Sequence, residues 1–276
     1  MAVSGVTARI DGQKHPIIEL LRDLQTEKGR AEFGQFYVEG PMIVLRAIEY
    51  GARIEAIICT DKFALAEASE SILSPARESG VKVYAVTEGL MGKVVPAKPP
   101  PGVVAIVERK LHRPSDILTG TSPIIFMVDR CENPDNLGML LRSLDAAGVD
   151  GVVLTDDSVD PFSRLSVRAS RGSVLSLKLS IAEHPEEWIV DAKSRGFQVA
   201  ASSAHGNDGL WMVDFRKPTV VVVGNEHTGV RESIRELADV FTRIPMVGKM
   251  ESLNIAVSGA ILAYEAARQR AGGNVK

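Results

Sequence analysis

The sequence predicts an α/β protein in which strands alternate with helices and pair into a mostly parallel sheet covered on both faces. Short apolar runs alternate with helical patterns along the chain, and several runs are continuously apolar, as in strands buried on both faces. Two strand candidates, Val220–Val223 and Val240–Ile244, each break at a glycine or proline that polar residues follow. Open α/β sheets bind ligands at the carboxyl ends of strands, so a site is expected there.

The first half of the chain is long enough for a small α/β domain. Proline at the start of two helical patterns and glycine at the end of one are typical of helix boundaries. The expected elements are a helix from Pro16, a strand Gln35–Val38, a helix from Pro41 that stops at Gly51, a strand Ile54–Cys59, a helix over 63–79 and a strand Val81–Val86.

A composition break follows, because four prolines (Pro96, Pro99, Pro100 and Pro101) crowd the stretch over 94–107. Such a segment is stiff and extended, as in a linker or at a domain edge. We therefore expect a first domain with its linker over 1–110 and a second domain over 111–276.

The second half repeats the alternation and ends in a long helix. Ser252 can cap this helix, and apolar residues recur after it at helical spacing as far as about Arg270. The expected strands are Ile124–Val128, Gly151–Leu154, Phe197–Ala200, Val220–Val223 and Val240–Ile244, and the other expected helices are Leu137–Ala147 and Trp188–Arg195.

Composition limits the class of protein. The formal net charge of -3 gives no overall positive potential that would indicate a nucleic-acid partner, although a local basic patch could still bind nucleic acid. The only cysteines, Cys59 and Cys131, are too few for a disulfide framework and favour a reducing interior. The N-terminus lacks a signal-peptide pattern and no apolar run has the length of a membrane span. These features together predict a soluble, cytoplasmic protein.

Two stretches have both a functional and an ordinary interpretation. Asn133–Gly138 is a polar turn followed by a helix start, which plain strand-to-helix turn chemistry also explains. Arg142 lies six residues beyond Asn136 in an otherwise apolar helix, so it either has a partner or lies on the outward face. Arg164, Arg168, Arg171 and Lys178 are interleaved with serines, as in a phosphate-binding face or a solvated helix face; Arg164 and Arg168 share one side of a helix.

Several familiar sites are excluded. Gly224–Gly229 does not have the G-x-G-x-x-G spacing of a dinucleotide fingerprint, which disfavours a nicotinamide-dependent oxidoreductase, and no Walker-type loop exists. The five histidines and two cysteines give no metal-ligand spacing, and a serine nucleophile elbow is absent. Spacing alone therefore leads only to an α/β domain with a site built from loops.

Three blocks in order go further. They are N-P-D-N-L-G-x-x-x-R-S (Asn133–Ser143), G-N-E-x-x-G (Gly224–Gly229) and I-P-M-x-G-x-x-x-S-L-N (Ile244–Asn254). This ordered set resembles the three motifs of the SpoU/TrmH branch of the SPOUT RNA methyltransferases, over roughly residues 122–270. The stretch Gly34–Pro41 extends the resemblance into the first half, which is similar to the small ribosomal-protein-like RNA-binding domain of these enzymes.

The resemblance implies a parallel-sheet domain with a deep trefoil knot, an exception to the rule that chains do not thread loops. It also implies a homodimer that binds S-adenosylmethionine, needs no metal, and methylates a ribose 2′-hydroxyl in RNA. An attached RNA-binding domain favours large-subunit ribosomal RNA, with housekeeping and antibiotic-resistance roles both open. The alternatives are a transfer-RNA 2′-O-methyltransferase and a non-catalytic RNA-binding relative.

The same resemblance assigns roles to individual residues. Arg142 would lie nearest the chemistry, Asn136 would shape the acceptor site, and Glu226 would brace it. Ser252 and Asn254 would orient the acceptor nucleotide and the loop before the last helix. The residues implied in cofactor binding are Ser202, Gly224, Asn225, Glu226, Ile244, Met246, Ser252 and Leu253, and those implied in RNA binding are Arg164, Arg168 and Arg171.

Overall fold

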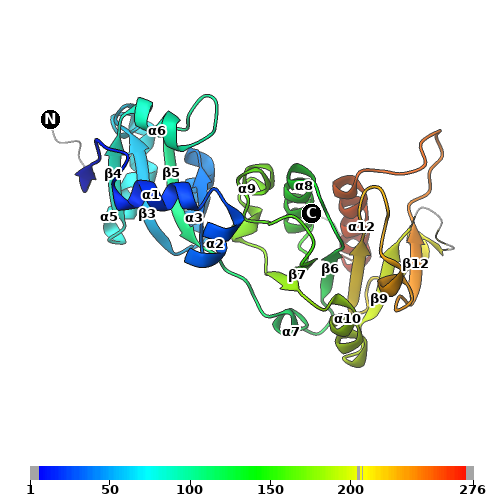
Figure 1. Cartoon of the computed structure of the whole chain (residues 1–276). Helices are drawn as coiled ribbons and strands as arrows, with labels where there is room; N and C mark the ends of the chain where they lie inside the picture. Colours follow the sequence, from blue (N-terminus) through cyan, green and yellow to red (C-terminus); the bar gives the residue numbers. More distant parts are fainter. Residues whose placement is uncertain (1–5, 204–205, 207, 272–276) are drawn as a thin grey trace. The chain divides into compact units, whose positions relative to one another are not determined.

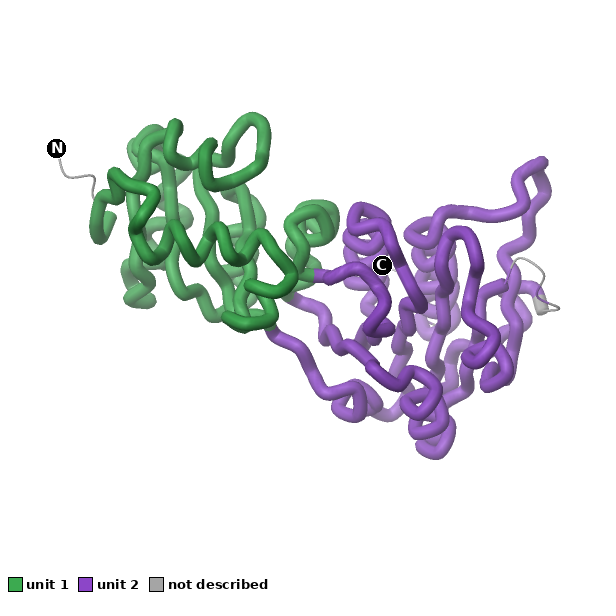
Figure 2. Tube along the Cα trace, in the orientation of Figure 1, with its two compact units in different colours: residues 1–109, 162–175 green, residues 110–161, 176–276 purple. Residues whose placement is uncertain are grey.

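The computed structural model describes residues 6–203, 206 and 208–271. The chain divides into two compact units (Figure 2). The first contains residues 1–109 and 162–175, and the second contains residues 110–161 and 176–276. Residues 162–175 therefore pack with the first unit, although they follow strands of the second unit in the sequence.

The first unit is built on a five-stranded sheet with the order β1-β4-β3-β5-β2, in which β5 runs antiparallel to both of its neighbours (Figure 1). Its strands are β1 (Ala8–Arg9), β2 (Gln35–Glu39), β3 (Ile54–Thr60), β4 (Lys82–Val86) and β5 (Val103–Glu108), and its α-helices are α1 (Pro16–Asp23), α2 (Glu27–Phe33), α3 (Pro41–Glu49), α4 (Asp61–Ala64), α5 (Glu70–Glu78), α6 (Glu88–Val94) and α9 (Arg164–Ser170).

The structure decides between the two interpretations of the proline-rich stretch and refines one expected helical segment. The proline-rich stretch is not a linker, because β5 within it lies between β3 and β2 and its residues Val103–Val107 are fully buried. Only the prolines before Val103 form a loop, where their missing backbone N–H is not needed. The segment over 63–79 is helical, as expected, and it is divided into α4, a 3₁₀ turn at Glu67–Ser69 and α5. Thr60 caps the N-terminus of α4 through a bond from the Phe63 N–H, so this helix begins as soon as β3 ends.

The segment over 162–175 joins the first unit through its side chains. Phe162 packs against Phe36 of β2 with ring centroids 4.9 Å apart, and both rings are buried. Arg164 of α9 forms an ion pair with Glu39 at 3.0 Å. Apolar burial and a partly buried ion pair together hold α9 against β2.

The second unit contains a seven-stranded sheet with the order β10-β12-β9-β11-β6-β7-β8. Every pairing in this sheet is parallel, which confirms the predicted architecture. Its strands are β6 (Ile124–Val128), β7 (Gly151–Thr155), β8 (Leu179–Ala182), β9 (Gln198–Ser202), β10 (Asp208–Gly209), β11 (Thr219–Val223) and β12 (Val240–Arg243), and its α-helices are α7 (Pro114–Ile117), α8 (Pro134–Ala146), α10 (Pro185–Ser194), α11 (Glu232–Arg235) and α12 (Ile255–Arg270).

Helices cover both faces of this sheet, as expected for strands that are apolar throughout (Figure 1). Trp188 and Ile189 of α10 and Ile234 of α11 share one core cluster with side chains of β6, β9 and β11. On the other face α8 and α12 lie against each other. They approach closely at Gly259, where an added Cβ would lie 2.2 Å from the Cδ1 methyl of Leu140 and would require that side chain to move.

The cap of α12 differs from the expected one. The side chain of Asn254, not Ser252, accepts a hydrogen bond from the Ala256 N–H at 2.8 Å. Ser252 lies two residues farther from the helix and is exposed. An asparagine cap is as favourable as a serine cap, so propensity could not choose between them.

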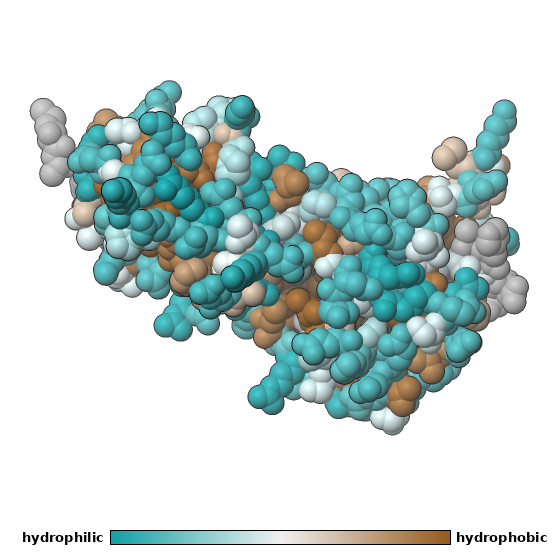
Figure 3. Space-filling model, in the orientation of Figure 1, coloured by the Kyte–Doolittle hydropathy of each residue, from teal (hydrophilic) through white to brown (hydrophobic). Residues whose placement is uncertain are grey.

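The surface face in Figure 3 is mostly hydrophilic, and hydrophobic residues form scattered spots on it. No described helix has both the length and the apolar character that a bilayer span requires.

Candidate cofactor and active site

A cavity of about 400 Å³ lies at the carboxyl ends of β9, β11 and β12. Because these strands are parallel neighbours, the loops that follow them meet at one edge of the sheet. The volume falls within the range of about 300–1,000 Å³ that is typical of small-molecule sites. Its lining residues are Ser202, Ser203, Val223, Gly224, Asn225, Glu226, His227, Thr228, Gly229, Val230, Arg235, Thr242, Ile244, Met246, Glu251, Ser252, Leu253, Ile255 and Ser258.

All eight residues implied in cofactor binding line this one cavity. They come from the ends of three strands and the loops that follow them, and they span 51 positions in the sequence, from Ser202 to Leu253. Other lining residues, such as His227 and Thr242, were missed because neither belongs to a fixed motif position. The one available signal for Thr242 is its place near the end of a strand that leads into the third block.

Glu226, Asn136 and Asn254 form a hydrogen-bonded chain. The Asn136 side-chain amide donates to the Glu226 carboxylate (Nδ2–Oε1 2.7 Å). The Asn254 amide donates in turn to the Asn136 carbonyl oxygen (Nδ2–Oδ1 2.9 Å). One residue comes from each of the three sequence blocks, so the fold brings all three blocks together beside the cavity.

Local sequence fixes two members of this chain at helix N-termini. Asn133 caps α8 by accepting bonds from the N–H groups of Asp135 and Asn136, at 2.9 and 3.1 Å. Asn254 caps α12 and uses its remaining amide donor for Asn136. The N-termini of both helices therefore meet here, and their partial positive charge favours the Glu226 carboxylate.

The loop 224–230 owes its shape to Asn225. The Asn225 side-chain oxygen accepts bonds from the N–H groups of His227 and Thr228, at 2.9 and 3.1 Å. Residue 224 must be a glycine, since a Cβ there would lie 2.2 Å from the backbone of Gly229. The turn is closed by backbone hydrogen bonds between Asn225 and Gly229, and its residues line the cavity.

Arg142 does not line the cavity. Its side chain is exposed on α8, and it forms no hydrogen bond or ion pair within the described part of the chain. The outward position is therefore the one that the structure shows. The guanidinium is free to meet a ligand from solvent.

The basic residues are arranged less uniformly than a single binding face would require. Arg164 is held in its partly buried ion pair with Glu39, so its charge is already matched. Arg168 and Arg171 are exposed. Arg171 ends α9 with a left-handed backbone (φ 55°). Of the three, Arg168 and Arg171 are the ones accessible to a ligand.

The cysteine nearest this site is inert. Burial raises the pKa of Cys131 to about 12, and the negative charge of Glu226 adds to the effect. A thiol with this pKa stays protonated at neutral pH and is a poor nucleophile. Among the described residues no cluster of histidine, cysteine, aspartate and glutamate could hold a metal ion.

Comparison with known proteins identifies the architecture. Residues 123–264 match the SpoU rRNA Methylase family, which is more than half of the chain. The chain belongs to this family. Residues 15–105 also match the MRM3-like substrate binding domain. The substrate binding domain match thus covers most of the first compact unit, and the SpoU match covers most of the second.

Relatives of known name match along most of the chain. The 23S rRNA (uridine(2479)-2′-O)-methyltransferase of Streptomyces viridochromogenes is 29% identical, with 88% of this chain and 86% of the relative covered. The 23S rRNA (guanosine(2553)-2′-O)-methyltransferase RlmP of Bacillus subtilis is 27% identical, with 93% and 98% covered.

Solved structures agree. The AdoMet-bound rRNA methyltransferase from Sinorhizobium meliloti has a TM-score of 0.85 and 30% identity, over 96% of this chain and 98% of the other. The SpoU methyltransferase AviRb from Streptomyces viridochromogenes, in complex with the cofactor AdoMet, has a TM-score of 0.81 and 27% identity, over 95% and 100%.

Proposed function

We propose that this protein transfers a methyl group from S-adenosylmethionine to a ribose 2′-hydroxyl of 23S rRNA. The observation that carries the proposal is the cavity at the strand ends, which adjoins the Glu226–Asn136–Asn254 chain. Full-length relatives named for this reaction support it.

Ribosomal RNA is favoured over transfer RNA as the substrate because the relatives named for ribosomal RNA match a larger share of this chain. The relatives named for 23S rRNA match across both compact units. The match to the TrmH/SpoU tRNA modifying enzyme of A. aeolicus covers only 58% of this chain, with a TM-score of 0.51. We therefore assign the first unit to recognition of the RNA, in keeping with its match to a substrate binding domain.

The residues of the cavity fit S-adenosylmethionine. Ile244, Met246 and Leu253 offer apolar surface to an adenine ring, and the loop 224–230 offers backbone groups to polar atoms. Thr242 is almost fully buried, and its hydroxyl lacks a hydrogen-bond partner within the described residues. Buried hydroxyls are normally bonded, so this one is suited to a ligand. When bound, the cofactor would supply an activated sulfonium methyl group.

The protein's own task is to align the acceptor and assist loss of its proton. Glu226 and Asn254 hold Asn136 from both sides, so the acceptor site is fixed before RNA arrives. Ser252, exposed on the cavity wall, would orient the acceptor nucleotide together with Asn254. The role of the Arg142 guanidinium is to bind the phosphate beside the acceptor ribose and to stabilise the developing alkoxide.

The proposal includes a trefoil knot and a homodimer. The chain passes from β11 through the loops 224–230 and 244–254 and then returns to pack α12 on α8, an arrangement suited to threading. Met139 on α8 and Val257 and Tyr264 on α12 are exposed apolar side chains. Together they give the α8–α12 surface an apolar character that suits the interface with a second copy of the chain. The second copy would then lie beside Arg142.

The direct test is transfer of labelled methyl from S-adenosylmethionine to total bacterial RNA, separated by size and digested to nucleosides. Label in a 2′-O-methyl nucleoside of 23S rRNA is expected. Label in transfer RNA alone would overturn the choice of substrate. A protein that binds the cofactor and labels no RNA class, including ribosomal RNA transcribed without modification, would contradict methyl transfer itself.

The Thr242 hydroxyl gives a sharper test of the cofactor site. Thr242→Val keeps the shape and removes the hydroxyl, so the Kd for S-adenosylmethionine is expected to rise about fivefold to tenfold, the value of one hydrogen bond. Isothermal titration calorimetry measures it. The control is Thr219→Val, at a buried threonine of β11 that does not line the cavity and whose hydroxyl is bonded to Lys217 and Gln198. An unchanged Kd for Thr242→Val would remove this hydroxyl from the site.

A further inference from the structure

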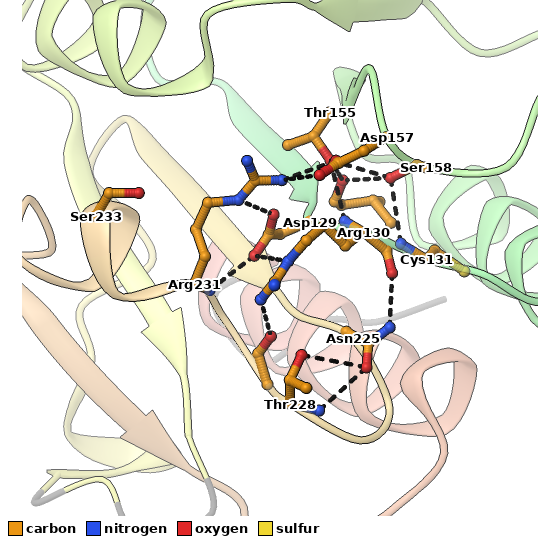
Figure 4. A network of polar contacts seen from close by, with 12 residues as sticks. Asp129, Arg130, Cys131, Thr155, Asp157, Ser158, Asn225, Thr228, Arg231 and Ser233 are labelled. Atoms are coloured by element: carbon orange, nitrogen blue, oxygen red, sulfur yellow. Dashed lines mark hydrogen bonds and ion pairs between the residues drawn. The ribbon is translucent and has the colours of Figure 1, made fainter.

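A second polar network lies at the carboxyl ends of β6 and β7, in contact with the loop 224–230 (Figure 4). At its centre is Asp129, which follows β6 directly and is completely buried. Arg231 contacts it twice, through the backbone N–H to Oδ2 at 2.8 Å and through Nε to Oδ1 at 2.6 Å. A buried carboxylate needs such matched partners, because isolated charge is strongly disfavoured away from water.

Arg231 reaches a second carboxylate with the other edge of its guanidinium. Its Nη2 donates to both carboxylate oxygens of Asp157, at 2.8 and 2.9 Å. Burial alone would raise the pKa of Asp157, yet bonds from Thr155 and Arg231 and the charge of Arg231 hold that pKa below its usual value. Asp157 therefore stays ionised at neutral pH. One planar guanidinium presents separate N–H donors to the two acids in a fixed geometry that the single ammonium of a lysine does not reproduce.

This bridge lies where the cavity loop ends. Arg231 immediately follows the loop 224–230, which contains Glu226 and lines the cavity. The start of the loop is tied to the same region, because the Asn225 amide donates to the Arg130 carbonyl at 2.9 Å and to Glu132 at 3.0 Å. A third tie joins Arg130 Nη2 to the Gly229 carbonyl at 3.2 Å. The loop is thus attached at both ends to residues 129–132.

Arg130 holds an unusual backbone to make these ties. Its φ of 56° lies in the left-handed region, which non-glycine residues rarely adopt. Its N–H donates to Thr155 at 3.0 Å, so the strand end after β6 is fixed to β7. Strained residues of this kind persist only where the surrounding contacts over-determine them.

We propose that Arg231 is a positioning residue for the methyl transfer proposed above: bridging Asp129 and Asp157, it holds the loop 224–230 in the shape that binds S-adenosylmethionine and presents Glu226 to Asn136. Arg231 acts from behind the loop and is not a lining residue of the cavity. Loss of the Arg231 side chain allows the loop 224–230 to move. The larger expected effect is weaker binding of S-adenosylmethionine, and the smaller one is a displaced Glu226.

The experiment compares Asp157→Asn, Arg231→Lys and Arg231→Gln with wild type and with Arg195→Gln. The control removes a similar arginine–aspartate pair, Arg195–Asp191, from the exposed surface of α10. Three quantities are measured for each: the melting temperature, the KM for S-adenosylmethionine and for RNA with kcat, and amide hydrogen exchange of the loop 224–230. Asp157→Asn removes only the Arg231–Asp157 ion pair, in which Asp157 is half exposed, and leaves the buried pair with Asp129 intact. This variant therefore still tests the inference if Arg231→Gln fails to fold.

The expected KM for S-adenosylmethionine rises about threefold in Asp157→Asn and about tenfold in Arg231→Lys, because an ammonium lacks the fixed fork of donors that reaches both acids. The KM for RNA stays within about twofold, and exchange in the loop 224–230 is faster while that of Ile124–Val128 is unchanged. If exchange accelerates equally throughout the sheet with KM unchanged, Arg231 is only structural and the inference is wrong. A wild-type protein that neither binds the cofactor nor transfers methyl would contradict the proposed function itself.

Discussion

Replacing Arg142 by alanine is expected to lower kcat for methyl transfer by about two to three orders of magnitude, the usual contribution of a group that stabilises charge developing in the transition state. The Kd for S-adenosylmethionine is expected to stay within about threefold, the range of a surface change away from the cavity. The difference follows from position. Arg142 is exposed on α8, does not line the cavity and bonds to no described residue, so its removal leaves no buried group unpaired.

Single-turnover transfer and calorimetric titration measure the two quantities separately. Arg142→Lys tests the kind of interaction, since lysine keeps the charge but cannot bind a phosphate with two parallel donors. Arg195→Ala, at the exposed C-cap residue of α10, controls for loss of a surface arginine. Turnover of Arg142→Ala at the wild-type rate would remove Arg142 from the mechanism.

Strands buried on both faces were the easiest elements to predict from sequence. In β6 and β11 every residue is buried, so the apolar run and the strand coincide. The predicted Ile124–Val128 matches β6 in full, and β11 extends the predicted strand by Thr219. Burial on both faces leaves a continuous apolar run, and that run is itself the signal.

Elements whose stability comes from tertiary contacts were missed or misplaced. In β8 (Leu179–Ala182) a serine, Ser180, is fully buried and donates to the His112 carbonyl at 2.8 Å. This bond to a residue 68 positions away satisfies the hydroxyl, and no local pattern reveals it. The strand β5 was hidden for another reason, because its apolar run follows four prolines whose composition is typical of a linker.

The same division holds for the site. Parallel strand order explains why Ser202, Gly224 and Ile244 share one cavity, and breaks at strand ends were visible in the sequence. Spacing alone did not distinguish Asn136 from an ordinary turn residue. The family resemblance gave Asn136 its expected role in the acceptor site. The bridge from Arg231 to Asp129 spans 102 positions and depends on side-chain geometry, so neither route predicted it.

The second large effect is expected from Asn136→Asp. Asn136 donates to Glu226 at 2.7 Å, and aspartate replaces that donor with a second carboxylate oxygen. Loss of a bond to a charged acceptor, with like-charge repulsion added, costs about 4 kcal/mol and lowers kcat/KM about a thousandfold at pH 8. The bond that Asn254 donates can persist, because its acceptor remains an oxygen.

This loss should depend on pH with a definite sign. Two adjacent carboxylates share a raised pKa, so one proton returns to the pair as the pH falls, and it restores an O–H donor between them. The ratio of variant to wild-type kcat/KM is therefore expected to rise at least tenfold from pH 8 to pH 5.5. Asn136→Leu, which has similar volume and no titrating group, should lose activity with a ratio that stays flat. A flat ratio for Asn136→Asp as well would mean that Asn136 does not hold Glu226 during the reaction.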